Sequence, residues 1–514
     1  MAWRRSLRGA RRVVVRHALA AAAGLALAGT AYGEALRDRV DLAYSVADQA
    51  TREVLPLCVQ PITSSTASYP STTRLDGTWG IGTAGNWAAG LFPGVMWKLY
   101  GRGGETFWRD HATTWTLPLA YKATSTSGDL SFNILNSFLP LYKLTNDPAH
   151  LQVIWNAAAS KNSTFNATVG TFRTGGGFSE IPGSDYYSLI DHLMDQEILI
   201  YAARTQGVAA YEANAITHGN RMAEVVVRAD GGSFQRAVFN STTGQFLDGM
   251  TKQGYRNSST WGRGQAWAMY GFAVTYRETG QCLDVARRMT DYWIANLPAD
   301  GVAYYDFDEM GMQVIPYRDS SGACIATAGM LDLAASEPDP VRAQAYYSAA
   351  LKSVWSLAGP DYLSRHTVYD SIVGHGAYTA PSNALEQGLV WGDYYYLEAL
   401  DRARPVWAKA GGGEWLEKDN WSSGMIHNLA DAGVMFGGRI VAPATVALGA
   451  TATTGSVGFD SAQGYTISGG GTLRLDVTQG QAQIDVRTGS HGIDVAVQPL
   501  DEMSIIVAGG SVLT

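Results

Sequence analysis

The stretch "STWGRGQAWAMYGFAVTYRETG" (259–280) decides how this sequence is interpreted. Arg263 stands between two glycines, and a segment rich in Trp, Met, Tyr and Phe follows. Flanking glycines contribute no side chains to bury the arginine stem, and they let the backbone approach closely. The guanidinium is then free to form a fork with a carboxylate. The stretch predicts an apolar helix over 262–280 that begins at a functional arginine.

Similar helical segments recur from about residue 38 to residue 405, separated by loops rich in Gly, Ser, Thr and Asp. Each is about one helix long and apolar on a wide face. Examples are residues 88–102, 133–147, 262–280 and 387–403. Strand patterns are scarce here, apart from short pieces such as "GVAYYDFD" (301–308). About a dozen such helices favour a closed barrel of helical hairpins. An α-solenoid is the alternative, although no constant repeat period is visible.

The composition changes after "GGGEW" (411–415), and Lys418 is the last lysine. The chain then alternates apolar and polar residues, with turn signals every ~8–12 residues. Residues 411–514 therefore predict a small all-β module, either a sandwich or a fragment of a β-solenoid. Its role is open between surface attachment and a plain structural appendage.

The N-terminus has the pattern of an export signal. A basic segment (1–17) precedes the apolar run "ALAAAAGLALAGTA", and Ala31-Tyr32-Gly33 places small residues at the cleavage-determining positions. The run is too short for a comfortable membrane span. We expect residues 1–33 to be a signal peptide, residues 34–410 to be the helical domain and the protein to be exported.

Composition excludes several classes of function. The net charge is −8, and no basic cluster lies beyond the N-terminus, which argues against nucleic acid as a partner. Three isolated cysteines and nine histidines show no zinc-binding spacing, so we expect neither a metal nor another cofactor. The fifteen Trp and twenty-six Tyr suit a core, and some of them also suit stacking on sugar rings.

Two carboxylates are candidates for chemistry, and periodicity alone decides neither. In "YYSLIDHLMDQEILIYAAR" (186–204), apolar spacing predicts a helix with Asp191 at the margin of its apolar face and Glu197 within that face. A solvated helix edge explains Asp191 equally well. In "TSTSGDLSFNILNSFLPLY" (124–142), Asp129 precedes an apolar helix, where an N-cap is the ordinary interpretation.

Several segments together resemble a known family. "STWGRGQAWAMYGF" is similar to the S-x-W-x-R-G-Q-A-W-x-x-Y-G-F hallmark of the unsaturated glucuronyl hydrolases, glycoside hydrolase family 88. "LIDHLMDQEIL" resembles the helix that carries the general acid/base of that family, and "GDLSF" resembles the segment of its second active-site aspartate. "RADGGSFQ", "TKQGY", "LPADGVAYYDFD", "RDSSGACIA" and "GLVWGDYYYLEAL" follow in the order of the family, so the resemblance covers roughly residues 40–403.

The resemblance implies an (α/α)6 barrel with the active site at one mouth. It implies that the substrate is the 4,5-unsaturated uronic acid that a polysaccharide lyase leaves at the non-reducing end of an oligosaccharide. Asp191 would be the general acid/base and Asp129 the second active-site carboxylate. Gln235, Gln253 and Arg263 would contact the substrate. Trp87 and Trp267 would supply stacking walls, and Glu197 would be a buried, paired structural residue.

Three departures from the family pattern matter. Gly128 stands where the family has a His before the second aspartate. Gln235 stands where many members have a titratable His. Asp195 replaces the usual Asn, and it would raise the pKa of Asp191 if both side chains face the site.

The sequence therefore predicts an exported hydrolase of unsaturated uronyl oligosaccharides. Its C-terminal β module is a candidate for cell-surface association. The alternatives are an unsaturated rhamnogalacturonyl hydrolase acting on pectin fragments and a non-catalytic carbohydrate-binding surface protein. Members acting on sulfated fragments carry a Ser/Lys group near the last helix, and residues 374–388 contain no lysine.

Overall fold

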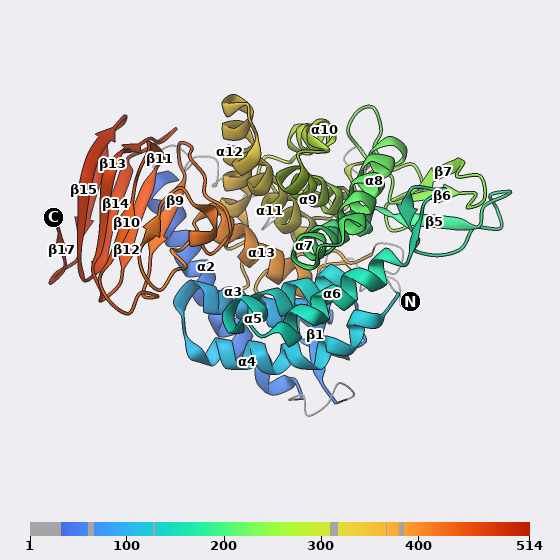
Figure 1. The fold of residues 1–514 in the computed structure, drawn as a ribbon, viewed down its shortest axis with the longest axis horizontal. Coiled ribbons are helices and arrows are strands. Elements are labelled where there is room, and N and C mark those ends of the chain that lie inside the picture. Colours follow the sequence, from blue (N-terminus) through green and yellow to red (C-terminus); the bar gives the residue numbers. More distant parts are fainter. Residues whose placement is uncertain (1–31, 60–65, 127–128, 309–316, 366, 380–384) are drawn as a thin grey trace, which may run out of the picture.

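The computed structural model describes residues 32–59, 66–126, 129–308, 317–365, 367–379 and 385–514. A helical body carries a β module at one end and a small three-stranded sheet at the other (Figure 1). The predicted signal peptide, apart from its last two residues, lies outside the described residues. In the described ranges, no helix has the length and apolar character required to span a membrane.

The helices form two concentric rings. The inner ring closes on itself, because each of its helices contacts the next and the last contacts the first, with the turn η3 (Ser131–Leu135) completing the contact between α5 and α7. The inner helices are α3 (Leu91–Gly103), α5 (Asn136–Thr145), α7 (Gln196–Gln206), α9 (Gly262–Thr279), α11 (Ser320–Ser336) and α13 (Val390–Ala403). The outer helices are α2 (Tyr32–Val54), α4 (Thr106–Thr116), α6 (Pro148–Asn162), α8 (Ala209–Val225), α10 (Leu283–Ala295) and α12 (Pro340–Leu357). Outer and inner helices alternate along the chain, which is the predicted (α/α)6 barrel.

Local sequence sets the ends of several helices. Asp147 and Asp339 each cap a helix whose first residue is proline, and both side chains accept a hydrogen bond from the backbone of that helix. Asp319 caps α11 in the same way. The decisive helix α9 ends at Gly280, whose φ of 72° is the left-handed conformation that glycine adopts at helix C-termini.

Shorter elements connect the helices. They are η1 (Leu55–Leu57), η2 (Leu117–Thr124), β1 (Ser68–Thr73), β2 (Trp79–Thr83), β3 (Phe165–Asn166), β4 (Thr171–Phe172), β6 (Arg236–Phe239) and β7 (Phe246–Met250). The strand expected at 301–308 is wrong, since Tyr304 and Asp306 form only isolated bridges, to Arg318 and Trp261.

The continuous helix expected over 186–204 is also wrong. Tyr186–Leu189 is β5, which pairs antiparallel with β6 and buries Tyr186 and Ser188. Ile190–Asp195 then forms the 3₁₀ turn η4, and α7 begins only at Gln196. The pairing of β5 with β6 overrides the helical periodicity of the segment. Asp191 therefore lies in a tight turn between a strand and a helix and not at the margin of a helical face.

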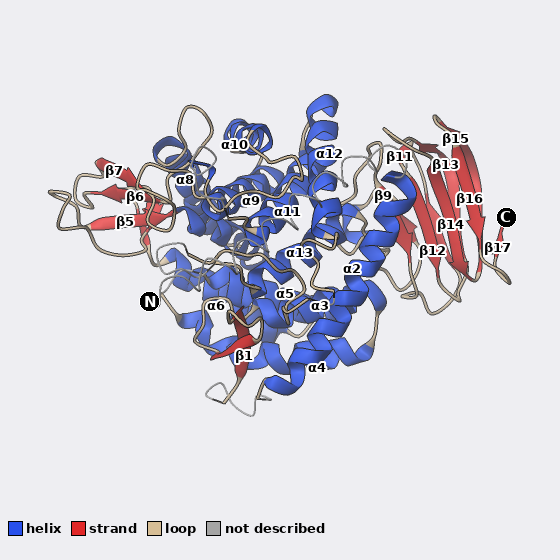
Figure 2. Cartoon of the chain, turned by 180° about the vertical axis from the view of Figure 1, so that it is seen from behind, coloured by secondary structure: helices blue, strands red, loops and turns tan. Residues whose placement is uncertain are grey.

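The C-terminal module is a β-solenoid, one of the two predicted options (Figure 2). Its strands pair in parallel, and the chain passes alternately between two sheets. One sheet contains β9 (Gly433–Phe436), β12 (Ser456–Asp460), β14 (Ala482–Thr488) and β16 (Met503–Val507). The other contains β8 (Gly413–Glu414), β10 (Ala444–Ala447), β11 (Ala452–Thr454), β13 (Tyr465–Leu475), β15 (Ser490–Pro499) and β17 (Val512–Leu513). The short helix η7 (Lys418–Asn420) precedes β9.

The solenoid packs against the barrel through ion pairs. Arg37 in α2 lies 3.0 Å from Asp485 in β14, and Arg487 pairs with Asp41 in α2. Arg404, just after α13, lies 3.4 Å from the same Asp41. The predicted boundary at residue 410 falls in the connection between α13 and β8.

Candidate active site

The predicted site residues lie around one mouth of the barrel. Because the chain reverses direction in each hairpin, the six inner helices run the same way and begin at the same mouth. Side chains at neighbouring helix starts contact one another. Trp391 Nε1 donates to Ser321 Oγ at 3.1 Å, and the backbone N–H of Ser131 donates to Asp195 Oδ1 at 2.9 Å.

Asp191 lies in the first turn of η4 and is partly exposed. Its Oδ2 is buried and has no hydrogen-bond partner among the described residues. Burial raises the pKa of Asp191 to about 6, and the charge of Asp195 acts in the same direction. Arg263 and Arg236 act against that shift. A carboxyl group with such a pKa is able both to donate and to accept a proton near neutral pH.

Asp129 does not cap a helix, so that interpretation is wrong. Leu130 occupies the N-cap position of η3, and the φ of Asp129 is 70°, a left-handed value that is uncommon for a residue other than glycine. Burial, together with the charges of Asp195 and Asp191, raises the pKa of Asp129 to about 7, and Lys161 and Lys122 act against that shift. The structure thus places two carboxyl groups with raised pKa values at this mouth.

The side chain of Asp195 is buried beneath the mouth and does not point out into solvent. Its Oδ2 lies 2.7 Å from Lys161 Nζ, and each side chain is 1% exposed. Its Oδ1 accepts the N–H of Ser131, two residues after Asp129. Asp195 therefore raises the pKa of both Asp191 and Asp129, and it also fixes the start of η3.

Gln235 is 2% exposed, and its direct contact with substrate stays a prediction that this burial disfavours. Its Oε1 accepts the N–H groups of Lys252 and Gln253, each at 3.0 Å, and its Nε2 donates to Gln253 Oε1 at 2.6 Å. Its carbonyl accepts the N–H of Ile190 at 2.9 Å, next to Asp191. Gln253 is partly exposed, and its Nε2 has no partner in the described part of the chain. Gln235 thus orients Gln253 and the turn that carries Asp191.

Arg263 is 2% exposed and lies under the mouth. Its Nη1 is 2.9 Å from Asp319 Oδ2 and donates to the carbonyl of Ala377 at 2.6 Å, while its Nη2 donates to the carbonyl of Tyr378 at 2.6 Å. Arg263 therefore contacts a carboxylate of the protein through Nη1 alone, and the predicted fork onto a carboxylate is not formed. Direct contact with substrate stays a prediction that this burial disfavours.

The two predicted stacking walls have different environments. Trp267 is 1% exposed and packs against Phe132 and Tyr395 at ring distances of 4.9 and 5.2 Å. Stacking of Trp267 on a sugar stays a prediction that this burial disfavours. Trp87 is partly exposed, and it packs on Trp391 at 4.8 Å and on Phe132 at 5.4 Å. Its exposed surface leaves a stacking role open.

The sequence analysis did not identify three cations of this site or the carboxylate that pairs with Arg263. They are Lys122, Lys161, Arg236 and Asp319. Asp319 had a signal, since an Asp followed by two serines before an apolar run is a helix N-cap. Lys161 had none, because it lies inside an outer helix and meets Asp195 only through the packing of α6 on the barrel.

The described residues contain no group of three or more His, Cys, Asp or Glu side chains placed to hold a metal ion. Cys58, Cys282 and Cys324 are free thiols. The arrangement that the structure presents is a carboxylate pair with positioned amides and an aromatic wall. Such a set is suited to acid–base chemistry on a polar substrate.

Comparison with known sequences gives the family. The profile of Glycosyl Hydrolase Family 88 matches residues 59–356, which is more than half of the chain. The chain belongs to this family. This family 88 enzyme is 30% identical to an unsaturated glucuronyl hydrolase of Formosa agariphila over 62% of its own length and 80% of that protein. It is 29% identical to an unsaturated chondroitin disaccharide hydrolase of Streptococcus pyogenes over 66% of this chain and 86% of that one.

Solved structures agree with the sequence relatives. A crystal structure of an unsaturated glucuronyl hydrolase specific for heparin superposes with a TM-score of 0.64 at 27% identity, covering 71% of this family 88 chain and 96% of the other. The unsaturated glucuronyl hydrolase of Bacillus sp. GL1 gives a TM-score of 0.63 at 26% identity, with the same coverage. The aligned share of 71% is consistent with the length of the barrel.

Proposed function

We propose that this family 88 enzyme removes the 4,5-unsaturated uronic acid from the non-reducing end of oligosaccharides produced by polysaccharide lyases. The reaction is hydration of the C4=C5 vinyl ether and not direct displacement at the anomeric carbon. The relatives named as unsaturated glucuronyl hydrolases and unsaturated chondroitin disaccharide hydrolases support this substrate class.

One observation carries the proposal. At the barrel mouth, Asp191 presents a buried Oδ2 with no partner in the described part of the chain, and its pKa is raised to about 6. A buried polar atom without a partner is costly unless a ligand completes it. A carboxyl group that is protonated for part of the time near neutral pH can give a proton to carbon and take one back from water.

The chemistry then balances in three steps. Asp191 gives its proton to C4, and the C=C electron pair forms the new C4–H bond, which leaves an oxocarbenium ion at C5. Water adds its oxygen to C5 and returns a proton to the Asp191 carboxylate. The resulting hemiketal opens to a 5-keto uronate and releases the remaining saccharide. The carboxylate separation that distinguishes inverting from retaining glycosidases has no bearing here, since the anomeric bond is not attacked.

The neighbouring groups have separable roles in this proposal. Asp129 lies beside the ring and orients its hydroxyls, and the charge of Asp191 raises the pKa of Asp129, which favours a neutral Asp129 that is able to donate a hydrogen bond. Gln253, held by Gln235, points its free amide nitrogen at the substrate. Trp87 supplies a partly exposed aromatic face for the next sugar.

A related function would use the same chemistry on a rhamnogalacturonyl fragment of pectin. A non-catalytic carbohydrate-binding role is disfavoured, because both carboxyl groups and their tuning charges are present. The absence of lysine from residues 374–388 favours substrates without sulfate.

Export is part of the proposal and rests on the leader-like residues 1–33. Surface association through the solenoid is also part of the proposal. The exposed apolar residues Ile505, Ile506 and Val512 on the last coil are consistent with attachment. Fractionation of cells that express the full chain, or the chain without residues 1–33, tests both claims.

Product labelling tests the mechanism. In D₂O, the proposal predicts one deuterium on a single face of C4 of the released uronate, read by NMR early in the reaction. Direct cleavage of the glycosidic bond would release the unsaturated uronic acid, which would take up deuterium on both faces as it tautomerises in solution. That second result would overturn the hydration mechanism.

A further inference from the structure

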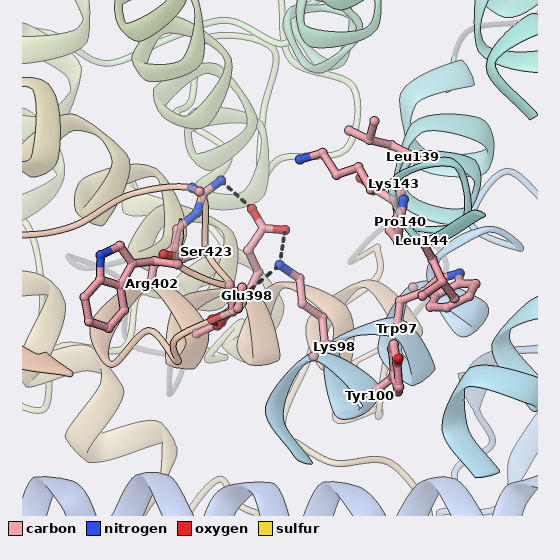
Figure 3. Close-up of a pocket in the computed structure, with 18 of the residues that line it drawn as sticks. Trp97, Lys98, Tyr100, Leu139, Pro140, Lys143, Leu144, Glu398, Arg402 and Ser423 are labelled. Atoms are coloured by element: carbon pink, nitrogen blue, oxygen red, sulfur yellow. Dashed lines mark hydrogen bonds and ion pairs between the residues drawn. The ribbon is translucent and has the colours of Figure 1, made fainter. Parts of the chain in front are cut away.

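A cavity lies at the mouth of the barrel opposite the active-site carboxylates, between the helices and the β module (Figure 3). Its volume is about 750 Å³. Its walls come mainly from α3, α5 and α13 and from segments 408–424 and 438–439, which lead into and through the solenoid, and Glu197 of α7 and Tyr270 of α9 also line it. The active-site carboxylates lie at the starts of the inner helices and do not line it.

The deep wall of this cavity is a network of paired charges. Arg402 Nη2 lies 2.5 Å from Glu398 Oε1, and Lys98 Nζ lies 3.8 Å from Glu398 Oε2 and 3.5 Å from Asp401 Oδ2. Burial alone would raise the pKa of Glu398, but Arg402 and Lys98 hold it at about 2. The distances from Lys98 exceed those of good hydrogen bonds, so its ammonium keeps donors available. Carboxylate acceptors and ammonium donors that lie side by side are suited to form hydrogen bonds with sugar hydroxyls.

The outer part of the cavity carries two cations that form no ion pair among the described residues. Lys143 is exposed, and no carboxylate of the described residues lies within ion-pair distance of it. In Figure 3 its side chain points into the space beside Glu398 and Lys98. Among the described residues, Arg439, from the module side, donates only to the carbonyls of Ala408 and Tyr100, at 3.3 and 3.4 Å.

The Nε of Arg439 is buried and has no partner among the residues that the structure describes. Asp419 is exposed and also lines the cavity, and it forms no ion pair in the described ranges. An unpaired lysine and an incompletely satisfied arginine that line the same cavity are able to hold an anionic oxygen together.

Aromatic surface completes the lining. Tyr100 is partly exposed, and the Arg439 guanidinium lies 5.2 Å above its ring. A volume of this size is in the range of ligand pockets, about 300–1,000 Å³. The cavity therefore combines hydroxyl-binding groups, an aromatic face and two cations, and the mechanism uses none of them.

We propose that this cavity is a second saccharide-binding site, which takes a sugar carrying a carboxylate. Lys143 and Arg439 hold the carboxylate, Lys98 and Asp401 bind ring hydroxyls, and Tyr100 contacts the ring. The solenoid contributes one wall, so its role is to complete this site. The inference does not depend on the reaction proposed for the other mouth.

Binding of D-glucuronate to the full chain, measured by isothermal titration calorimetry, tests the proposal. D-glucuronate has no vinyl ether and is not turned over. The double change Lys143→Ala/Arg439→Ala is expected to weaken one saturable binding event by about tenfold or more, since hydrogen bonds to charged groups contribute about 1.5–3 kcal/mol. Lys409→Ala, an exposed lysine outside the cavity, is the matched control and is expected to bind like the parent.

Two further arms separate this site from the active site and from a general anion site. Trp87→Ala, at the other mouth, is expected to retain the event. Inorganic sulfate and D-glucose are each expected to bind at least tenfold more weakly than D-glucuronate. Unchanged binding in the double variant would overturn the proposal, and so would sulfate or glucose binding as tightly as glucuronate. Turnover of lyase products by the double variant is expected to match the parent, so a failed binding result is distinct from a failed enzymatic assignment.

Discussion

Lys161 Nζ lies 2.7 Å from Asp195 Oδ2 beneath the barrel mouth, and both side chains are 1% exposed. A buried pair of this kind contributes to function through the field that it creates, and its net contribution to stability is small. Asp195 raises the pKa values of Asp191 and Asp129, whereas Lys161 lowers that of Asp129. The two members of the pair thus shift the pKa of Asp129 in opposite directions, and Asp195 also raises the pKa of Asp191.

Asp195→Asn is expected to shift the pH profile downward. Removing the negative charge lowers the pKa of both carboxyl groups, so the protonated acid is lost at lower pH. The alkaline limb of kcat/KM then moves down by about 0.5–1 pH unit. Lys161→Met removes the opposing charge and is expected to move the limb upward. Each variant loses about 3–5 kcal/mol of stability, so the profiles are recorded well below the Tm. Shifts in the same direction, or no shift in either variant, would contradict the role given to this pair.

Both Gln235→Ala and Gln253→Ala are expected to act on substrate binding through the side-chain amide of Gln253. Each raises KM, because Gln253 loses either its orientation or its contact with substrate. The double variant is expected to cost little more than Gln253→Ala alone, which a double-mutant cycle measures as a coupling of about 1 kcal/mol or more. Full additivity would show that Gln235 reaches the substrate independently.

Arg263→Lys is expected to lower stability more than substrate affinity. A lysine cannot donate to Asp319, Ala377 and Tyr378 together, and a buried Asp319 with a poor partner costs about 3–5 kcal/mol. Thermal unfolding reports this as a clear fall in Tm. An unchanged Tm with a large rise in KM would return Arg263 to the role of a direct substrate contact.

The two tryptophans offer a matched pair. Trp267→Ala is expected to cost about 3–5 kcal/mol of stability, because it opens a cavity in the core. Trp87→Ala is expected to raise KM with a smaller change in Tm, since part of its indole is already exposed. A Trp87→Ala variant with a parent KM would remove Trp87 from the substrate site.

The sequence predicted the elements whose signals are local. The helix expected at 262–280 is α9, with Gly280 as its C-cap, and the alternation after residue 411 is the solenoid. Resemblance to the family placed Asp191 and Asp129 at one mouth. It did not show that the side chains of Gln235 and Trp267 are buried, at 2% and 1% exposed. The strand at 186–189 and the Lys161–Asp195 pair depend on tertiary partners, β6 and α6, which periodicity does not encode.

The most direct test of the central claim follows the ultraviolet absorbance of the conjugated uronate while the enzyme acts on a panel of lyase-generated oligosaccharides. The parent is expected to remove that absorbance on at least one uronyl oligosaccharide. Asp191→Asn is expected to slow the decay by about 10³-fold or more without a comparable loss of stability. No decay on any member of the panel, or decay in Asp191→Asn at the parent rate, would contradict the account.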